Sequence, residues 1–258
     1  MPAIYRLLLV CYYIILLLGF SFFLILFYNF SLLFCSLGNE MSVLPSVIVN
    51  ATSKHTASLI FLHGLGDTGH GWSQGFSGLG INHLKSICPN ASVIPVTLNA
   101  GFRMPAWFDI YSLNPGQRED DEGIKSSAIE IRKLVEEEIK SGIPSDRIVL
   151  GGFSQGGALA LYTALTMEKT LGGILALSSW LPLHKEFPKC VKGNRDTPIL
   201  QCHGDADPVV PCEFGEMSKG VLTSFCSKVE FKKYSGMAHS SSDQVSFLSP
   251  FFVNSQST

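Results

Sequence analysis

From Val47 onward, short apolar runs alternate along the chain with longer stretches that carry apolar residues on one face only. Short apolar runs bounded by polar turns are typical of buried strands, and one-sided apolar stretches are typical of helices packed on a sheet. Their alternation predicts an α/β fold with a mostly parallel central sheet flanked by helices. The predicted strands are Ser58–Leu62, Ser92–Val96, Arg147–Gly151, Gly173–Leu177, Pro198–Cys202 and Lys228–Tyr234.

The clearest predicted helix runs from about Glu122 to Lys140, where apolar residues recur at steps of three and four. Asp120 and Asp121 suit the positive N-terminal end of this helix, and Gly142 and Pro144 end it. Two further helices are predicted over Ser154–Glu168 and Glu213–Phe225.

Residues 7–28 form an uncharged, strongly apolar segment. As a helix, such a segment spans roughly 30 Å, the thickness of the hydrocarbon layer of a membrane. One interpretation is therefore a membrane anchor within residues 1–40. The competing interpretation takes residues 1–40 as an upstream extension, because Met41 opens a stretch typical of the start of a soluble domain. We predict three parts: residues 1–40, a catalytic domain over 41–243, and a C-terminal tail over 244–258.

Composition narrows the classes of function. The net charge is −2 and no run is rich in Lys and Arg, so we do not expect a nucleic-acid partner. The seven Cys residues are widely spaced and form no C-x-x-C pair, which argues against a zinc site or a disulfide framework. We therefore expect neither a metal nor another cofactor, and no pattern sets the oligomeric state.

A G-x-S-x-G pattern follows the strand predicted to end at Gly151, with Ser154 at its centre. The pattern is short enough to occur by chance, but a strand before it and a helix after it are the context of a catalytic serine. Glycines on either side of the serine permit a bend too tight for side chains. The N-terminal amides of the following helix point toward the oxyanion that forms during attack. We predict Ser154 as a nucleophile.

A serine hydroxyl needs a base, and in this context an acid and then a histidine follow the serine along the chain. His239 lies just after the last predicted strand, so we predict it as the base. The pairing of Glu186 or Asp196 with His203 is the alternative that the same order leaves open.

The acid is expected after the strand Pro198–Cys202, where Asp205 and Asp207 are both candidates. We favour Asp207 because Pro208 stiffens the backbone next to it, and the acid must hold the imidazole rigidly. Asp205 is then expected to bond the amides of its own loop. His203 is expected to hold the same loop.

The loop His63–Gly69 follows the first of the predicted strands and is rich in glycine. A loop in this position normally supplies the second oxyanion donor, so we predict the backbone amides of Leu65 and Gln155 as the donors. The loop lacks the Gly-Lys-Ser/Thr ending of a phosphate-binding loop.

Several motifs, in the same order along the chain, resemble the acyl-protein thioesterase family, the small lysophospholipase and carboxylesterase relatives among the α/β hydrolases. The resemblance implies a lidless α/β-hydrolase fold, the triad Ser154, Asp207 and His239, and a catalytic domain in the cytoplasm. It also implies removal of palmitoyl groups from protein cysteines. The motifs are FLHGLGDTGHGW (61–72), PVTLN (95–99), MPAWFD (104–109), GGFSQGGALALYTAL (151–165), LSSWLPL (177–183), ILQCHGDADPVVP (199–211) and GMAHSS (236–241).

Apolar side chains on loops beside the predicted triad indicate a channel for a fatty acyl chain. We predict Met104, Trp180 and Val209 as substrate-binding residues, with Trp107, Leu181 and Val210 nearby. The expected substrates are S-acylated proteins. A lysophospholipase or general carboxylesterase would use the same catalytic groups.

The tail over 244–258 departs from the family, whose members end in an amphipathic helix. Pro250 and the absence of a charged face prevent such a helix here. A third hypothesis is therefore an inactive variant that binds acylated partners without turnover.

Overall fold

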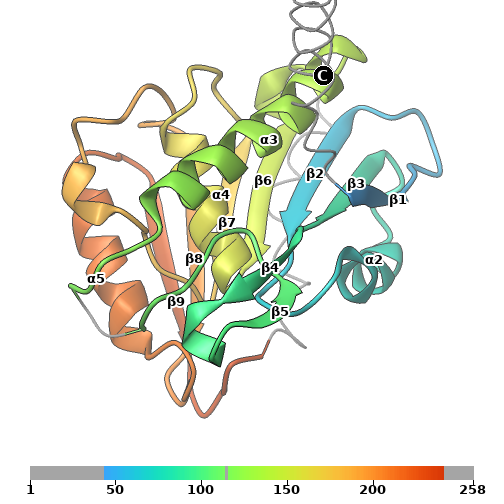
Figure 1. The fold of residues 1–258 in the computed structure, drawn as a ribbon. Helices are drawn as coiled ribbons and strands as arrows, with labels where there is room; N and C mark the ends of the chain where they lie inside the picture. Colours follow the sequence, from blue (N-terminus) through green and yellow to red (C-terminus); the bar gives the residue numbers. More distant parts are fainter. Residues whose placement is uncertain (1–43, 114–115, 241–258) are drawn as a thin grey trace, which may run out of the picture. The chain divides into compact units, whose positions relative to one another are not determined.

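The computed structural model describes residues 44–113 and 116–240. Its centre is a seven-stranded sheet of order β1-β3-β2-β6-β7-β8-β9 (Figure 1). Neighbouring strands from β3 to β9 run parallel, and only the edge strand β1 pairs antiparallel, with β3. This confirms the predicted mostly parallel sheet. The strands are β1 (Leu44–Val49), β2 (Ala57–Leu62), β3 (Leu84–Asn90), β6 (Ile148–Phe153), β7 (Gly173–Leu177), β8 (Ile199–Gly204) and β9 (Val229–Tyr234).

Helices cover both faces of this sheet. Alternate residues of β2 point to opposite faces, because successive side chains in a strand alternate. Ile60 and Leu62 join a core with three helices, whereas Leu59 and Phe61 pack with Trp72 on the opposite face. The first face carries α3 (Asp121–Lys140), α4 (Gln155–Leu165) and α5 (Cys212–Thr223), and the second carries α2 (Gly69–Ser77).

One predicted strand belongs elsewhere. β4 (Val93–Val96) pairs with β5 (Phe102–Pro105) in a separate two-stranded hairpin, and not in the central sheet. The place beside β2 is taken by β3, which the sequence analysis missed because Lys85 and Pro89 interrupt its apolar pattern. The other predicted strands match β2, β6, β7, β8 and β9 to within two residues.

Helix α2 was also missed, and the reason is local propensity. Its sequence GHGWSQGFS contains three glycines, which weaken a helix by about 1 kcal/mol each. Packing overrides this cost, since Trp72 and Phe76 lie against Phe61 with ring centroids 4.4 and 5.1 Å away.

The caps of α3 agree with the prediction. The Asp120 side chain accepts a hydrogen bond from Gly123 N at the first turn, and acidic residues occupy that turn. Gly142, with φ of 102°, follows the helix in a backbone conformation that glycine adopts readily. Helix α4 ends at Leu165, three residues before the predicted end.

A buried carboxylate ties α3 to the sheet. Glu138 is only 3% exposed, and its side chain accepts hydrogen bonds from Ser58 Oγ and Lys85 Nζ, both at 2.6 Å. His55 Nε2 lies 3.6 Å from the same carboxylate. The cluster therefore links α3 to the starts of β2 and β3.

We expect Glu138→Leu to lower the free energy of unfolding by about 3 kcal/mol, because in a largely buried place Lys85 then loses this partner and Ser58 Oγ keeps only His55 Nε2. Urea unfolding measures the change. Glu137→Leu is the matched control, since Glu137 is the preceding residue of the same helix and is exposed. Equal unfolding midpoints for the two variants would show that the cluster contributes nothing to stability.

The predicted membrane segment over residues 7–28 and the tail over 244–258 both lie outside the described residues. Within residues 44–113 and 116–240, no helix is both long enough and apolar enough to cross a membrane.

Candidate active site

Ser154 occupies a strained turn between β6 and α4. Its φ and ψ are 53° and −121°, a backbone conformation that costs a residue other than glycine roughly 1–3 kcal/mol. The flanking glycines are required by close packing. A Cβ on Gly152 would lie 2.3 Å from the carbonyl carbon of Gly156, and one on Gly156 would lie 2.2 Å from Leu62 O. The tight strand-to-helix turn predicted from the G-x-S-x-G pattern is therefore present.

The structure brings Asp207 and His239 together. His239 Nδ1 lies 2.7 Å from Asp207 Oδ2, at hydrogen-bond distance. The other carboxylate oxygen, Oδ1, accepts hydrogen bonds from Val209 N and Val210 N, both at 2.9 Å. The Asp207 side chain is fully buried, so the carboxylate is fixed in place and holds the imidazole from its Nδ1 side.

The imidazole of His239 lies next to the serine turn, because it packs against Phe153, the residue before Ser154. The centroids of the Phe153 and His239 rings are 4.7 Å apart. Ser154 itself is buried, at 8% exposure. Within the described part of the chain no hydrogen bond joins the Ser154 hydroxyl to His239, so their alignment stays a prediction.

Asp205 joins two loops: the loop after β8 that carries Asp207, here called the acid loop, and the loop after β9 that carries His239, here called the histidine loop. Its Oδ1 accepts a hydrogen bond from Gly236 N at 2.6 Å, and its own amide donates to Tyr234 O at 3.0 Å. Ala206 N adds a bond to Met237 O at 3.2 Å. The prediction that Asp205 bonds the amides of its own loop is therefore wrong. Because β8 and β9 are parallel neighbours, their loops leave the sheet at the same edge and bond to each other.

His203 holds the acid loop, as expected. It is 1% exposed, and its Nε2 donates to Val210 O at 2.8 Å. The same nitrogen lies 3.5 Å from Asp207 Oδ2. Burial lowers the pKa of His203, which favours the neutral ring. The alternative pairings of His203 with Glu186 or Asp196 are not formed, since those carboxylates bond Lys125 and Ser227.

The predicted oxyanion loop lies beside the serine turn. A Cβ on Gly64 would lie 3.1 Å from the Phe153 ring and 3.5 Å from Ser154 Cβ. Leu65 follows in this loop, and Gln155 is the first residue of α4. The Gln155 side chain is buried and fastens the helix end, because Oε1 accepts from Trp107 N at 3.1 Å. That the amides of Leu65 and Gln155 point at an oxyanion stays a prediction.

His63 fixes the same loop, a role that the sequence analysis missed. Its Nδ1 lies 2.7 Å from Gly64 O, and its Nε2 accepts from Ala91 N at 3.0 Å. An amide donor on Nε2 requires the neutral ring with its proton on Nδ1. Burial lowers the pKa of His63 and favours the same state. Trp107 Nε1 donates to His63 O at 2.8 Å and closes the arrangement.

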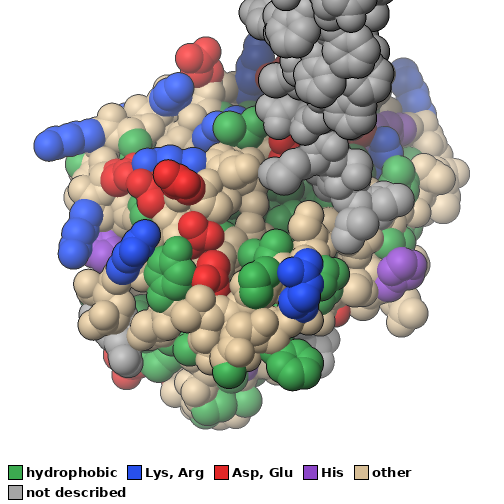
Figure 2. Space-filling model, in the orientation of Figure 1, with side chains coloured by type: hydrophobic (Ala, Val, Ile, Leu, Met, Phe, Trp, Pro, Cys, Tyr) green, Lys and Arg blue, Asp and Glu red, His purple; other side chains and the backbone are tan. Residues whose placement is uncertain are grey.

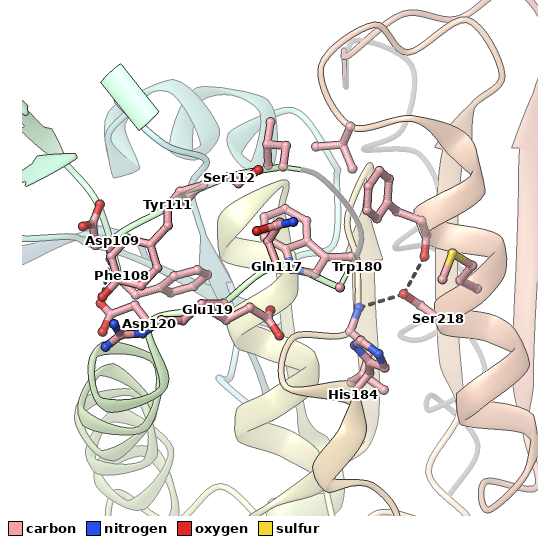
Figure 3. Close-up of a pocket in the computed structure, with 18 of the residues that line it drawn as sticks. Phe108, Asp109, Tyr111, Ser112, Gln117, Glu119, Asp120, Trp180, His184 and Ser218 are labelled. Carbon is pink, nitrogen blue, oxygen red and sulfur yellow. Dashed lines mark hydrogen bonds between the residues drawn. The ribbon is translucent and has the colours of Figure 1, made fainter. Parts of the chain in front are cut away.

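An apolar cavity of about 340 Å³ lies between the segment that precedes α3, the loop after β7, and α5 (Figure 3). Of the three residues predicted to bind substrate, Trp180 lines this cavity. Met104 and Val209 lie outside its lining, and Val209 is 46% exposed. The apolar lining that the sequence analysis missed comprises Phe108, Ile110, Leu113, Phe214, Met217 and Val221.

Three hydrogen bonds connect the cavity wall to the candidate catalytic residues. Gln155 Nε2 donates to the carbonyl of the lining residue Phe108 at 2.7 Å. Ser179, which precedes Trp180, donates from its hydroxyl to Ser154 O at 2.8 Å. The third bond is that of the lining residue Val210 to Asp207, described above. The wall of the cavity is therefore hydrogen-bonded to Ser154, Gln155 and Asp207, although none of these three residues lines the cavity itself.

The described residues offer no group of three or more His, Cys, Asp or Glu side chains that could hold a metal ion. The five cysteines in this part of the chain are free, and burial raises the pKa of each of their thiols. A raised pKa keeps a thiol protonated and unreactive at neutral pH.

A parallel sheet with a serine on its strand-to-helix turn, and an acid–imidazole pair at the ends of its last strands, defines an α/β hydrolase. The family model for phospholipase/carboxylesterase matches residues 45–251. Acyl-protein thioesterase 1 of Gibberella zeae is 48% identical over 206 residues, covering 75% of this chain and 88% of that protein. Acyl-protein thioesterase 1 of Schizosaccharomyces pombe is 44% identical over 211 residues, covering 81% and 94%.

Solved structures give the same result. The crystal structure of Zea mays acyl-protein thioesterase 2 matches with a TM-score of 0.73 at 32% identity, covering 81% of this chain and 99% of that chain. The chain belongs to the phospholipase/carboxylesterase family and, within it, to the acyl-protein thioesterases.

Proposed function

We propose that this chain is a serine hydrolase that removes fatty acyl groups from S-acylated protein cysteines through an acyl-Ser154 intermediate. The observation that carries this proposal is an apolar cavity whose wall is hydrogen-bonded to the candidate catalytic residues. The lining residue Val210 donates to Asp207, and Ser179, which precedes the lining residue Trp180, donates to Ser154 O. Relatives named acyl-protein thioesterase support the substrate class. The same relatives do not favour a lysophospholipase.

The proposed reaction begins when Ser154 Oγ attacks the thioester carbonyl and His239 Nε2 takes the hydroxyl proton. The amides of Leu65 and Gln155 hold the oxyanion, and Asp207 stabilises the imidazolium. The carbon–sulfur bond then breaks, and the imidazolium returns the proton to the cysteine sulfur. A water molecule, deprotonated by His239, hydrolyses the acyl-serine in the same way and releases the fatty acid.

The cavity suits an apolar chain because several of the polar groups in its lining are already engaged. Asp109 accepts from Thr97 N, and Ser218 Oγ accepts from Leu181 N while donating to Phe214 O. These groups have little left to offer a polar ligand. Each methylene that leaves water contributes up to about 0.8 kcal/mol of binding.

On the face seen in Figure 2, acidic and basic side chains are interspersed, which does not favour a nucleic-acid partner.

A substrate panel with the full chain tests the proposal. We expect the purified protein to react with a fluorophosphonate probe and to prefer a palmitoylated peptide thioester over a lysophospholipid or a short ester. Preference for lysophospholipid would overturn the substrate class. Failure to label, with a relative labelled in parallel, would instead favour the inactive acyl-binding variant.

We propose the division into residues 1–40, a catalytic domain over 41–243 and a tail over 244–258 on the sequence pattern, with a cytoplasmic catalytic domain. Membrane association through residues 7–28 is the finer part of this proposal. Carbonate extraction of membranes tests it, with the full chain compared with one that begins at Met41. Release of both forms by carbonate would exclude an anchor.

We expect Asp205→Ala to lower kcat about tenfold with little change in KM. The loop that carries His239 loses its bond at Gly236 N, and small displacements of a catalytic group cost much of its effect. Steady-state hydrolysis of an acyl thioester measures both constants. Glu230→Ala is the control, since Glu230 is exposed on the neighbouring strand. An unchanged kcat would show that Asp205 does not position the histidine loop.

A further inference from the structure

The loop Ser178–Leu183 connects the serine turn to the cavity. Near its start, Ser179 donates to Ser154 O, and next along it Trp180 and Leu181 line the cavity. Both ends are left-handed, with φ of 47° at Ser178 and 51° at Leu183. Residues other than glycine rarely adopt this conformation, so the loop keeps its shape only through the contacts that hold it.

Glu119 holds this loop from the opposite cavity wall. Its Oε2 accepts a hydrogen bond from Leu183 N at 2.9 Å. Figure 3 shows Glu119 and Trp180 on the cavity wall, with Ser218 on the α5 side. There, Ser218 Oγ accepts from Leu181 N at 2.7 Å. The loop is therefore held at Leu181 and at Leu183 by two segments that are distant in the sequence.

Glu119 differs from the other two carboxylates in the cavity lining. Asp109 is bonded to Thr97, and Asp120 caps α3 and bonds Asp109 N, so neither carboxylate bonds another wall of the cavity. Glu119 alone among these three reaches the loop after β7. Burial raises its pKa, while the Leu183 amide and the nearby His184 lower it. A carboxylate withdrawn from water depends on these partners.

We infer that Glu119 is a positioning residue that determines acyl-chain specificity, because it fixes the Trp180–Leu183 wall against which a long acyl chain packs. This inference deepens the proposed function and rests on it. Glu119 takes no part in the chemistry. Its loss frees Leu183 and lets the preceding lining residues Trp180 and Leu181 shift, so the cavity fits a long chain less well. A short acyl group makes little use of this wall.

The test compares the hydrolysis of palmitoyl and acetyl thioesters of one peptide by the unaltered chain, Glu119→Gln and Glu119→Leu. We expect Glu119→Leu to lower the ratio of kcat/KM for palmitoyl over acetyl about tenfold, mainly through a higher KM for palmitoyl. Glu119→Gln keeps an acceptor oxygen for Leu183 N and should recover part of the ratio. Glu122→Gln is the control, because Glu122 is exposed near the start of α3.

The outcomes separate this inference from the proposed function. No hydrolysis of the palmitoyl thioester by the unaltered chain would overturn the proposed function. Hydrolysis by the unaltered chain with an equal loss for both substrates in Glu119→Leu would overturn the inference alone, since a merely structural role lowers both. Thermal unfolding checks that the variants fold. If Glu119→Leu does not fold, Glu119→Gln together with Ser218→Ala decides the question through the same ratio.

Discussion

Ser154→Ala is expected to lower kcat at least about ten-thousand-fold and to abolish labelling by a fluorophosphonate probe, because no other group replaces the attacking hydroxyl. Alanine meets the same backbone strain at φ 53° as serine does, so the fold should not change. Hydrolysis of a palmitoylated peptide and probe labelling measure the two effects. The thermal unfolding midpoint checks the fold.

Ser224→Ala is the matched control for this experiment, since Ser224 is an exposed serine that follows α5. It should keep both activity and labelling. Retained labelling of Ser154→Ala would place the nucleophile elsewhere. Ser179 is the first residue to test in that case, although its hydroxyl already donates to Ser154 O.

Local sequence signals predicted the parts of the site that depend on neighbours in the chain. The serine turn needs glycines within two residues of Ser154, and the pattern contains them. The choice of Asp207 over Asp205 rested on the stiffening effect of Pro208. The structure adds the hydrogen bond from the His239 ring, which Asp207 has and Asp205 lacks.

Local sequence patterns could not predict contacts between segments that are distant in the sequence. His63 holds its loop through Ala91, and Asp205 bonds Gly236, in each case across adjacent strands whose pairing the sequence does not state. For the same reason, the sequence predicted only part of the cavity lining. Trp180 carried a visible signal as an apolar residue on a loop. Met217 looked like an ordinary apolar position of a helix, and only the fold places it in the cavity lining.

Asp207→Asn is expected to lower kcat about ten-thousand-fold while leaving the loop in place. The asparagine oxygen can keep accepting from Val209 N and Val210 N, which places its NH₂ group toward His239. The NH₂ group of asparagine can donate only to an unprotonated Nδ1, so the proton of the neutral imidazole moves to Nε2. With a proton on Nε2, the ring cannot take the proton of Ser154, and the base is lost without loss of the histidine.

Two further variants, a double variant and a control, test this expectation. The double variant Ser154→Ala/Asp207→Asn should be no slower than Ser154→Ala, because groups that act as one unit do not contribute additively. Asp196→Asn should keep full activity, since Asp196 bonds Ser227 at an exposed position. Steady-state rates on a palmitoyl thioester measure all three variants. A loss smaller than about tenfold in Asp207→Asn would mean that His239 keeps its working tautomer without Asp207, and would remove the carboxylate from the proposed triad.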